Sequence, residues 1–206
     1  MPETLGLRER KRNERRRAIE TAAIDLFETN GFDATTIDDI ARAVDIAPRT
    51  FFSYFSTKED VVLADYSQRL DRIITELGHR PSTEPPWQAL GAAFAIVAAD
   101  YESQRKELLR RFTIMATTPS VYARSLQLQA GWEDTLAVTL AQRSQANLDD
   151  PNPRLLAAAA LAAMRASLQH WLHRGQTSPL PQIISGAFDH LARGLDEQSG
   201  QRSATR

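Results

Sequence analysis

The sequence predicts an all-α protein in two parts, a three-helix head over residues 1–60 and a helical bundle over residues 61–206. Apolar residues recur at the three- and four-residue spacing of one helix face in segment after segment. Residues that begin or end helices, such as Thr, Asp, Pro and Gly, separate these segments. No segment alternates apolar and polar residues as a half-buried strand would. These three observations favour helices joined by short turns.

The first two helices have clear ends. The apolar face of the first helix comprises Ile19, Ala22, Ala23, Leu26 and Phe27. Asn30-Gly31 ends it, because glycine accepts the left-handed conformation of a C-cap. Thr35 or Thr36 can cap the second helix, and Asp38 and Asp39 fall in its first turn, where the helix dipole favours carboxylates. Ile37, Ile40, Ala41 and Val44 form its apolar face.

A tight corner at residues 45–47 follows, and Pro48 is well placed as the first residue of a short third helix. We expect one further helix from Lys58 to Leu77, and then a linker at residues 80–86 that is rich in proline. The predicted helices of the second part span residues 87–103, 105–117, 119–145, 154–174 and 180–196.

The composition, 42% hydrophobic and 25% charged, is that of an ordinary globular protein. No apolar run is long enough to cross a bilayer, the N-terminus lacks the apolar core of a signal peptide, and there are no cysteines. We therefore expect a cytoplasmic protein. The net charge is −1, yet residues 8–17 carry seven basic and two acidic side chains, a net +5 that leaves −6 for the rest. Such a basic arm suits a protein that meets phosphate at one end only.

Three short helices with a three-residue corner between the second and the third match the helix-turn-helix pattern of DNA-binding proteins. Ile40, Val44, Ile46, Phe51 and Phe55 supply an apolar underside. Arg49, Thr50, Ser53 and Tyr54 are left to point outward, and these side chains bond phosphate oxygens or base edges. Lys58 begins the next helix, where it and the free backbone N–H groups can hold a phosphate.

About fifty residues of the head resemble the signature of the tetracycline-repressor (TetR) family. The matching residues are Ala22-Ala23, Leu26-Phe27, Gly31-Phe32, Thr35-Thr36, Asp39-Ile40-Ala41, Pro48-Arg49-Thr50-Phe51-Phe52, Tyr54-Phe55 and Lys58-Glu59. The resemblance implies a homodimeric, ligand-responsive regulator, usually a repressor, whose third helix enters the major groove of a palindromic double-stranded DNA operator. The implied DNA contacts, together with two residues of the basic arm, are Arg12, Arg16, Thr36, Pro48, Arg49, Thr50, Tyr54 and Lys58.

Two of these contacts have a structural alternative, and one position departs from the family. Thr36 can act simply as a helix cap and Tyr54 as a core residue. The family commonly has tyrosine where this chain has Phe52, so a hydroxyl contact to phosphate is missing there. Each phosphate that the basic arm neutralises adds about 0.9 to the salt dependence of binding, so the arm can compensate.

The second part shows none of the residue patterns of an enzyme, such as a glycine-rich phosphate loop or a nucleophile elbow. His170 and His173 are three residues apart but have no acidic partner nearby, so we expect no metal and no cofactor. The last two helices are rich in small and apolar side chains, which favours a four-helix dimer interface; the alternative is that they form only the subunit core.

The resemblance places an effector site inside the second part. The candidate ligand-binding residues are Phe94, Tyr101, Phe112, Met115, Tyr122, Trp132, Met164 and Arg165. Arg165 interrupts an Ala/Leu-rich helix, where an unpaired charge would be costly. Residues 132–133, 157–163 and 187–189 are similar to a subgroup of the family associated with acyl-coenzyme-A-like ligands. The small-molecule effector is thus expected to be a fatty acyl thioester or, second, a planar aromatic compound.

A different class of protein also fits the basic arm. A helical lipid-binding or partner-binding protein could place it on an anionic membrane surface. The arm lacks the bulky apolar face of an interfacial helix, however, since Leu5 and Leu7 are its only candidates. We therefore expect no membrane contact.

Overall fold

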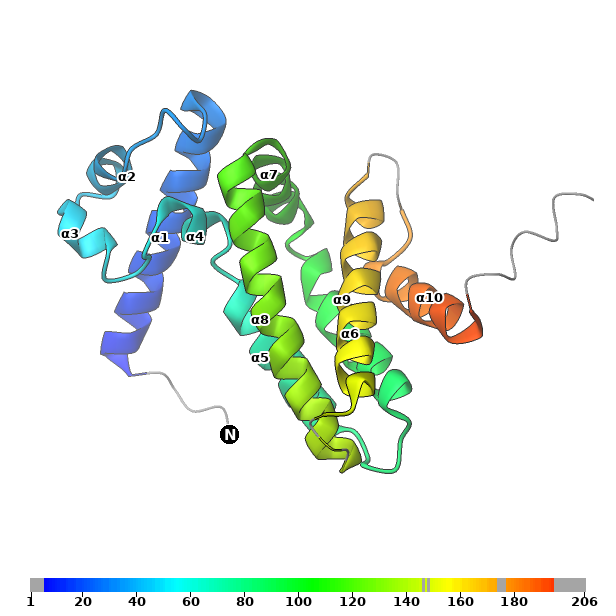
Figure 1. Ribbon diagram of the computed structural model, residues 1–206. Coiled ribbons are helices and arrows are strands. Elements are labelled where there is room, and N and C mark those ends of the chain that lie inside the picture. The colour runs from blue at the N-terminus through cyan, green and yellow to red at the C-terminus, as the bar shows by residue number, and fades with distance from the viewer. Residues whose placement is uncertain (1–5, 146, 148, 174–176, 195–206) are drawn as a thin grey trace, which may run out of the picture. The chain divides into compact units, whose positions relative to one another are not determined.

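The computed structural model describes residues 6–145, 147, 149–173 and 177–194, and every regular element in these ranges is a helix. The all-α prediction is confirmed. The elements are α1 (Leu7–Asn30), α2 (Ile37–Ala43), α3 (Pro48–Phe51), α4 (Lys58–Val62), α5 (Tyr66–His79), α6 (Pro86–Glu102), α7 (Arg105–Thr117), α8 (Pro119–Ser144), α9 (Pro151–Leu172) and α10 (Leu180–Arg193), all labelled in Figure 1.

The chain forms two compact units. The first comprises residues 1–66 and 106–127, so α7 and the beginning of α8 pack with the N-terminal helices. The second comprises residues 67–105 and 128–206. The division expected at residue 60 places α7 in the second part. That domain boundary stays a prediction.

In the first unit, α1 packs against α2 and α4, and α3 packs against α2 (Figure 1). Ile19, Ile24, Ile40 and Phe51 are completely buried in its core. Gly31 ends α1 with a φ of 87°, a positive value that glycine adopts without strain. The corner before α3 also needs one left-handed residue, and Asp45 supplies it with a φ of 52°.

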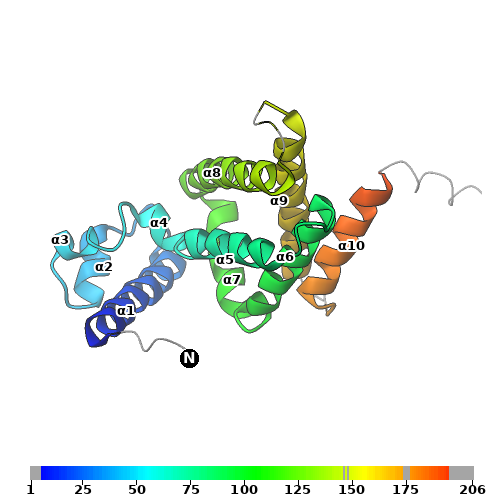
Figure 2. The same cartoon turned by 90° about the horizontal axis from the view of Figure 1, so that it is seen from below.

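In the second unit, α10 lies beside α6 and α9, as both views show (Figures 1 and 2). Trp87 of α6 stacks on Phe188 of α10 with ring centroids 4.6 Å apart, and its indole Nε1 donates to the Phe188 carbonyl oxygen at 3.1 Å. The helices approach closely at Gly91, where an added Cβ would lie 2.9 Å from the Phe188 ring. A glycine at this position therefore sets the spacing of α6 and α10.

The single helix expected from Lys58 to Leu77 is wrong, because a turn at residues 63–65 divides it into α4 and α5. In an unbroken helix the Val61, Val62 and Ala64 carbonyls would accept from backbone N–H groups four residues later. Here Arg111 donates to the first two carbonyls and Arg16 to the third. The break is therefore stabilised by guanidinium donors that are distant in the sequence.

The other predicted bounds agree with the structure to within a few residues. The helix expected at 154–174 begins earlier, at Pro151, where Asp150 caps it by accepting from the Asn152 backbone N–H at 2.9 Å. Residue 174, and residues 195–196 of the helix expected at 180–196, lie outside the described residues.

Candidate nucleic-acid interface

The N-terminus of α2 is closed by a reciprocal cap between Thr36 and Asp39. The Thr36 hydroxyl accepts from the Asp39 backbone N–H at 3.1 Å, while the Asp39 carboxylate accepts from the Thr36 backbone N–H at 3.1 Å and from its hydroxyl at 2.6 Å. Hydrogen bonding from Thr36 holds the pKa of Asp39 below its ordinary value. Thr36 is thus the helix cap, and its contact with DNA stays a prediction.

The exposed side of α3 is small and mixed in character. Pro48, Arg49, Phe52 and Ser53 are exposed, whereas Phe51 on the opposite side is completely buried. Thr50 and Tyr54, which we expected to point outward, are half-buried. Phe52, which sequence reasoning treated only as the loss of a hydroxyl, lies on the outward side with 56% of its surface exposed. The helical period predicts this position once the buried residue Phe51 is identified.

Lys58 binds backbone oxygens between α1 and α2. Its ammonium donates to the carbonyl oxygens of Phe32 at 2.7 Å and Thr35 at 3.1 Å, with Asp33 at 3.5 Å, and lies 4.4 Å from the centroid of the Phe32 ring. These contacts tie the beginning of α4 to the loop before α2. If Lys58 also binds a phosphate, as predicted, its ammonium must either keep these carbonyl contacts and bind the phosphate as well, or give them up.

The basic arm is the first part of α1 rather than an extended tail. Arg12 is exposed, whereas Arg16 is half-buried. Arg16 donates to the Glu20 carboxylate and to the Ala64 carbonyl, both at 3.1 Å, and its guanidinium lies 4.8 Å from the centroid of the Phe55 ring. The structure therefore separates the two predicted arm contacts: Arg12 is open to solvent, and Arg16 connects α1 to the segments after α3 and α4.

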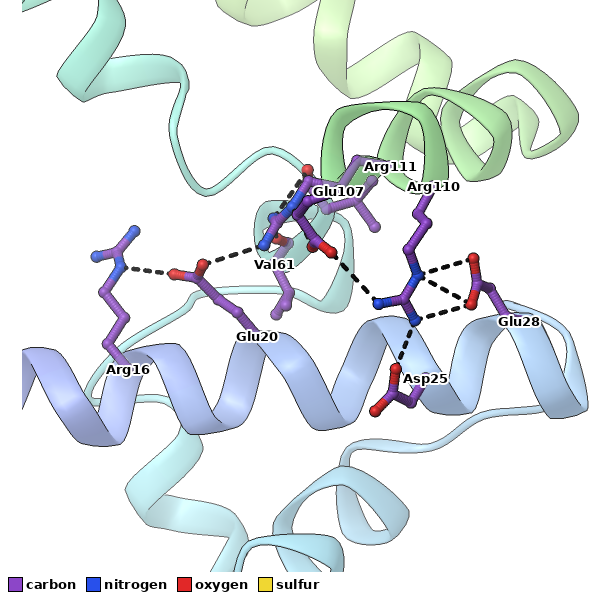
Figure 3. A network of polar contacts seen from close by, with 9 residues as sticks. Arg16, Glu20, Asp25, Glu28, Val61, Glu107, Arg110 and Arg111 are labelled. Carbon is purple, nitrogen blue, oxygen red and sulfur yellow. Dashed lines mark hydrogen bonds and ion pairs between the residues drawn. The ribbon is translucent and has the colours of Figure 1, made fainter. Parts of the chain in front are cut away.

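A buried ion pair connects α1 and α4 to α7 within the first unit (Figure 3). The Arg111 side chain is only 10% exposed and donates to the Glu20 carboxylate at 3.1 Å, to Glu107 at 3.0 Å, and to the Val61 and Val62 carbonyls at 2.7 and 3.3 Å. Burial raises the pKa of the Glu20 carboxyl above its ordinary value, although the Arg111 charge acts in the opposite direction. Because Glu20 and Arg111 are 91 residues apart, no local sequence pattern predicts this pair.

Arg110, the preceding residue, makes a second connection from α7 to α1 (Figure 3). It binds Glu28 with two nitrogens, at 3.0 and 2.7 Å, and also pairs with Asp25 and Glu107. Hydrogen bonding to Glu28, with a smaller contribution from Asp25, raises the pKa of Arg110. The carboxylates of Glu28 and Asp25 are exposed, which distinguishes this contact from that of Arg111.

The eight candidate ligand residues fall in both units. Phe94, Tyr101, Trp132 and Met164 are buried in the second unit, whereas Phe112 and Met115, both half-buried, and the exposed Tyr122 belong to the first. The Arg165 side chain is exposed and donates to the Gln129 amide oxygen at 2.9 Å. The argument from a buried charge therefore does not apply to Arg165. Among the described residues, no group of three or more His, Asp or Glu side chains is arranged to hold a metal.

Two family models match the chain. The model described as bacterial regulatory proteins of the tetR family matches residues 19–64, and the model described as the MftR C-terminal domain matches residues 84–196. The regulator MftR of Mycobacterium tuberculosis is 32% identical over 187 residues, which cover 91% of this chain and 94% of that protein. The regulator TcmR of Streptomyces glaucescens is 32% identical over 201 residues, which cover 94% and 88%.

Solved structures show the same fold. The TetR-family repressor FadR of Thermus thermophilus, crystallised with lauroyl-CoA, has a TM-score of 0.58 at 23% identity and covers 87% of this chain and 94% of its own. A TetR-family regulator from Syntrophomonas wolfei has a TM-score of 0.65 at 20% identity, with 89% and 97% covered. No helix within the described ranges is long and apolar enough to cross a membrane. The matched relatives are regulators rather than enzymes. Because the two family models match most of the chain and relatives at 32% identity cover over nine-tenths of it, the chain belongs to the TetR family of DNA-binding transcriptional regulators.

Proposed function

We propose that this regulator is a repressor that binds a palindromic operator as a homodimer and is released by a small, largely apolar effector. The observation that carries the proposal is the exposed side of α3, with Arg49 between Pro48 and Phe52 over a fully buried Phe51. A short helix with an apolar underside and an exposed arginine suits the major groove, where arginine binds guanine with two hydrogen bonds. Arg12 on the exposed side of α1 adds a phosphate contact.

The dimer is supported by the surface of α9 and α10. Leu180, Ile184 and Phe188 bury one side of α10 within the subunit. Ile183, Ala187 and Leu191 follow at four-residue intervals on another side and are only half-buried. An apolar row of this kind, beside the alanine-rich α9, allows close helix packing across a two-fold axis. Two such subunits would present two copies of α3 to the half-sites of a palindrome.

The effector is proposed to be a fatty acyl thioester. Buried aromatic residues of the second unit, among them Phe94, Tyr101 and Trp132, supply apolar surface for a long chain. The similar fold of the FadR protein crystallised with lauroyl-CoA supports this class of ligand. A planar aromatic compound is the alternative, and a competition assay distinguishes the two.

Release of DNA is proposed to pass through α7. This helix lies within the range of the C-terminal family model, yet its Arg110 and Arg111 bind α1 and α4 of the head. A displacement of α7 by the effector would therefore move α1 with it, because breaking the Arg110 and Arg111 contacts costs free energy.

Selection of DNA from a random pool by the full-length protein tests the proposal. A palindromic consensus, bound with an affinity that falls steeply with salt, supports it. Arg49→Ala is expected to weaken binding to that operator about 10-fold or more while thermal stability stays nearly unchanged. Lys106→Ala, which removes the same charge from an exposed position outside the head helices, is the matched control.

Two further measurements address the effector and the alternative class. Lauroyl-CoA at micromolar concentration should release the labelled operator, whereas a planar aromatic dye in its place would identify the other ligand class. Binding to anionic vesicles in a flotation assay, without selection of any DNA sequence, would instead favour the membrane-surface protein.

A further inference from the structure

Phe52 directly follows α3 as its C-cap residue and continues the exposed side of this helix. The residue is 56% exposed, whereas Phe51 and Phe55 beside it are 0% and 4% exposed. At 3.6 residues per turn, Phe52 projects between Pro48 and Arg49 of the preceding turn, and Ser53 lies next to it. A large apolar side chain is thus exposed on the side of the head that is otherwise suited to polar contacts.

The Phe52 ring has an aromatic neighbour in Phe51. Phe51 contacts it edge to face, with ring centroids 5.6 Å apart and an interplanar angle of 88°. The backbone of Phe52 is also helical, with φ of −64° and ψ of −13°. The ring contact favours one orientation of the side chain, which reduces the conformational freedom that it loses when it binds a partner.

We propose that Phe52 is a specificity-determining residue that recognises the C5-methyl group of a thymine in each operator half-site. The inference rests on the proposed operator binding. A phenyl ring has no hydrogen-bonding group, so it cannot replace a hydroxyl on a phosphate. Of the groups that the base pairs present in the major groove, the thymine methyl is the apolar one, and phenylalanine is among the side chains that contact it.

The neighbours of Phe52 favour the same partner. The guanidinium of Arg49 and the hydroxyl of Ser53 lie on the same exposed side and can bond base edges or phosphates. A ring between them would reach the floor of the groove rather than its charged rim. Recognition at this base pair then depends on burial of the methyl and the ring, and it is independent of the hydrogen bonds on either side.

Uracil substitution in the DNA measures this contact directly. Each thymine of the selected operator is replaced by deoxyuridine, one symmetric pair at a time, which removes the methyl and keeps every base-pair hydrogen bond. Burial of one methyl corresponds to about a fourfold change in affinity, so we expect a loss of about 15-fold over two half-sites at one pair of positions. At the other thymines the wild-type protein should lose less than about twofold.

Variants of the protein complete the test. Phe52→Ala should bind the thymine operator more weakly and show no further loss on uracil substitution at the sensitive positions. Phe52→Tyr keeps the ring and should keep the sensitivity, and so should Arg49→Ala, which leaves the ring unchanged. Thermal melting checks that each variant is folded. Because Arg49 and Phe52 are both exposed, we expect their replacement to leave the melting temperature nearly unchanged.

Three results would overturn the inference. The first is that uracil at every thymine pair lowers the affinity of the wild-type protein by less than about twofold. The second is that Phe52→Ala retains full uracil sensitivity. The third is that Phe52→Tyr binds more tightly and loses that sensitivity, which would indicate a phosphate contact. In each case the palindrome is still bound, so operator recognition itself stands. Failure to select any palindrome, by contrast, contradicts the proposed function.

Discussion

Replacement of Arg111 by methionine removes the charge from the buried contact between α7, α1 and α4. The substitution keeps most of the aliphatic stem, so the loss is mainly polar. It leaves the Glu20 carboxylate without its α7 partner, and the Val61 and Val62 carbonyls without their guanidinium donor. Loss of one member of a buried ion pair costs about 3–5 kcal/mol. Because Arg16 still binds Glu20, we expect about 3 kcal/mol, or roughly 6–12 °C in melting temperature for a chain of this size.

The matched control is the adjacent residue. Arg110→Met removes the same group from the same helix, but its partners Glu28 and Asp25 are exposed, so its cost should be about 1 kcal/mol or less. Urea unfolding followed by circular dichroism gives both free energies. An Arg111→Met cost no larger than that of Arg110→Met would refute the reasoning, because burial would then make no difference.

A pH titration adds a second test of the same pair. Arg111 lowers the pKa of Glu20 against the larger effect of burial, so its removal should raise that pKa further. Glu20 then takes up a proton at higher pH in the variant, and the difference in stability from the wild type shrinks as the pH falls through this pKa. The double variant Arg111→Met/Glu20→Gln should cost less than the sum of the single changes.

Three other predictions concern the cap of α2, the α6–α10 contact and the beginning of α4. Hydrogen bonds from Thr36 lower the pKa of Asp39, so this carboxylate stabilises the fold above its ordinary pKa of 3.8, and the stabilisation is lost as the pH falls through the lowered value. Asp39→Asn should therefore reduce the acid dependence of the melting temperature below about pH 4, and an unchanged dependence would count against it. Gly91→Ala should lower the free energy of unfolding by about 1–3 kcal/mol, because the new Cβ meets the Phe188 ring; calorimetry showing no loss would mean that the helices separate freely. Lys58→Met should weaken operator binding with a reduced salt slope if Lys58 reaches a phosphate, and should lower the melting temperature instead if its ammonium serves only the Phe32 and Thr35 carbonyls.

The head was predictable because its signals are local. Gly31 ends α1 and Pro48 begins α3, as expected, and Thr36 is the one of the two expected candidates that caps α2. Each of these signals depends on backbone groups within a few residues. The outward position of Phe52 also follows from the helical period, although sequence reasoning considered only its missing hydroxyl.

The break between α4 and α5 was not predictable in this way. Residues 58–77 show a continuous helical pattern, and no proline or glycine marks the turn at residues 63–65. The donors that stabilise the turn, Arg16 and Arg111, are 48 or more residues away from the carbonyls that they bind. Arg165 shows the converse case: an Ala/Leu-rich helix suggested a buried charge, but the side chain is exposed and bonded to Gln129.

The sequence by itself determined the helical class, the register of the head and its family, because helical periodicity and capping act over a few residues. Tertiary structure decided which charges are buried. Glu20 and Arg111 are 91 residues apart, and neither has a neighbour in the sequence that reveals the pairing. Burial is a property of the packed chain: two charges enter the interior only where folding brings opposite signs together and supplies hydrogen bonds that offset their loss of water.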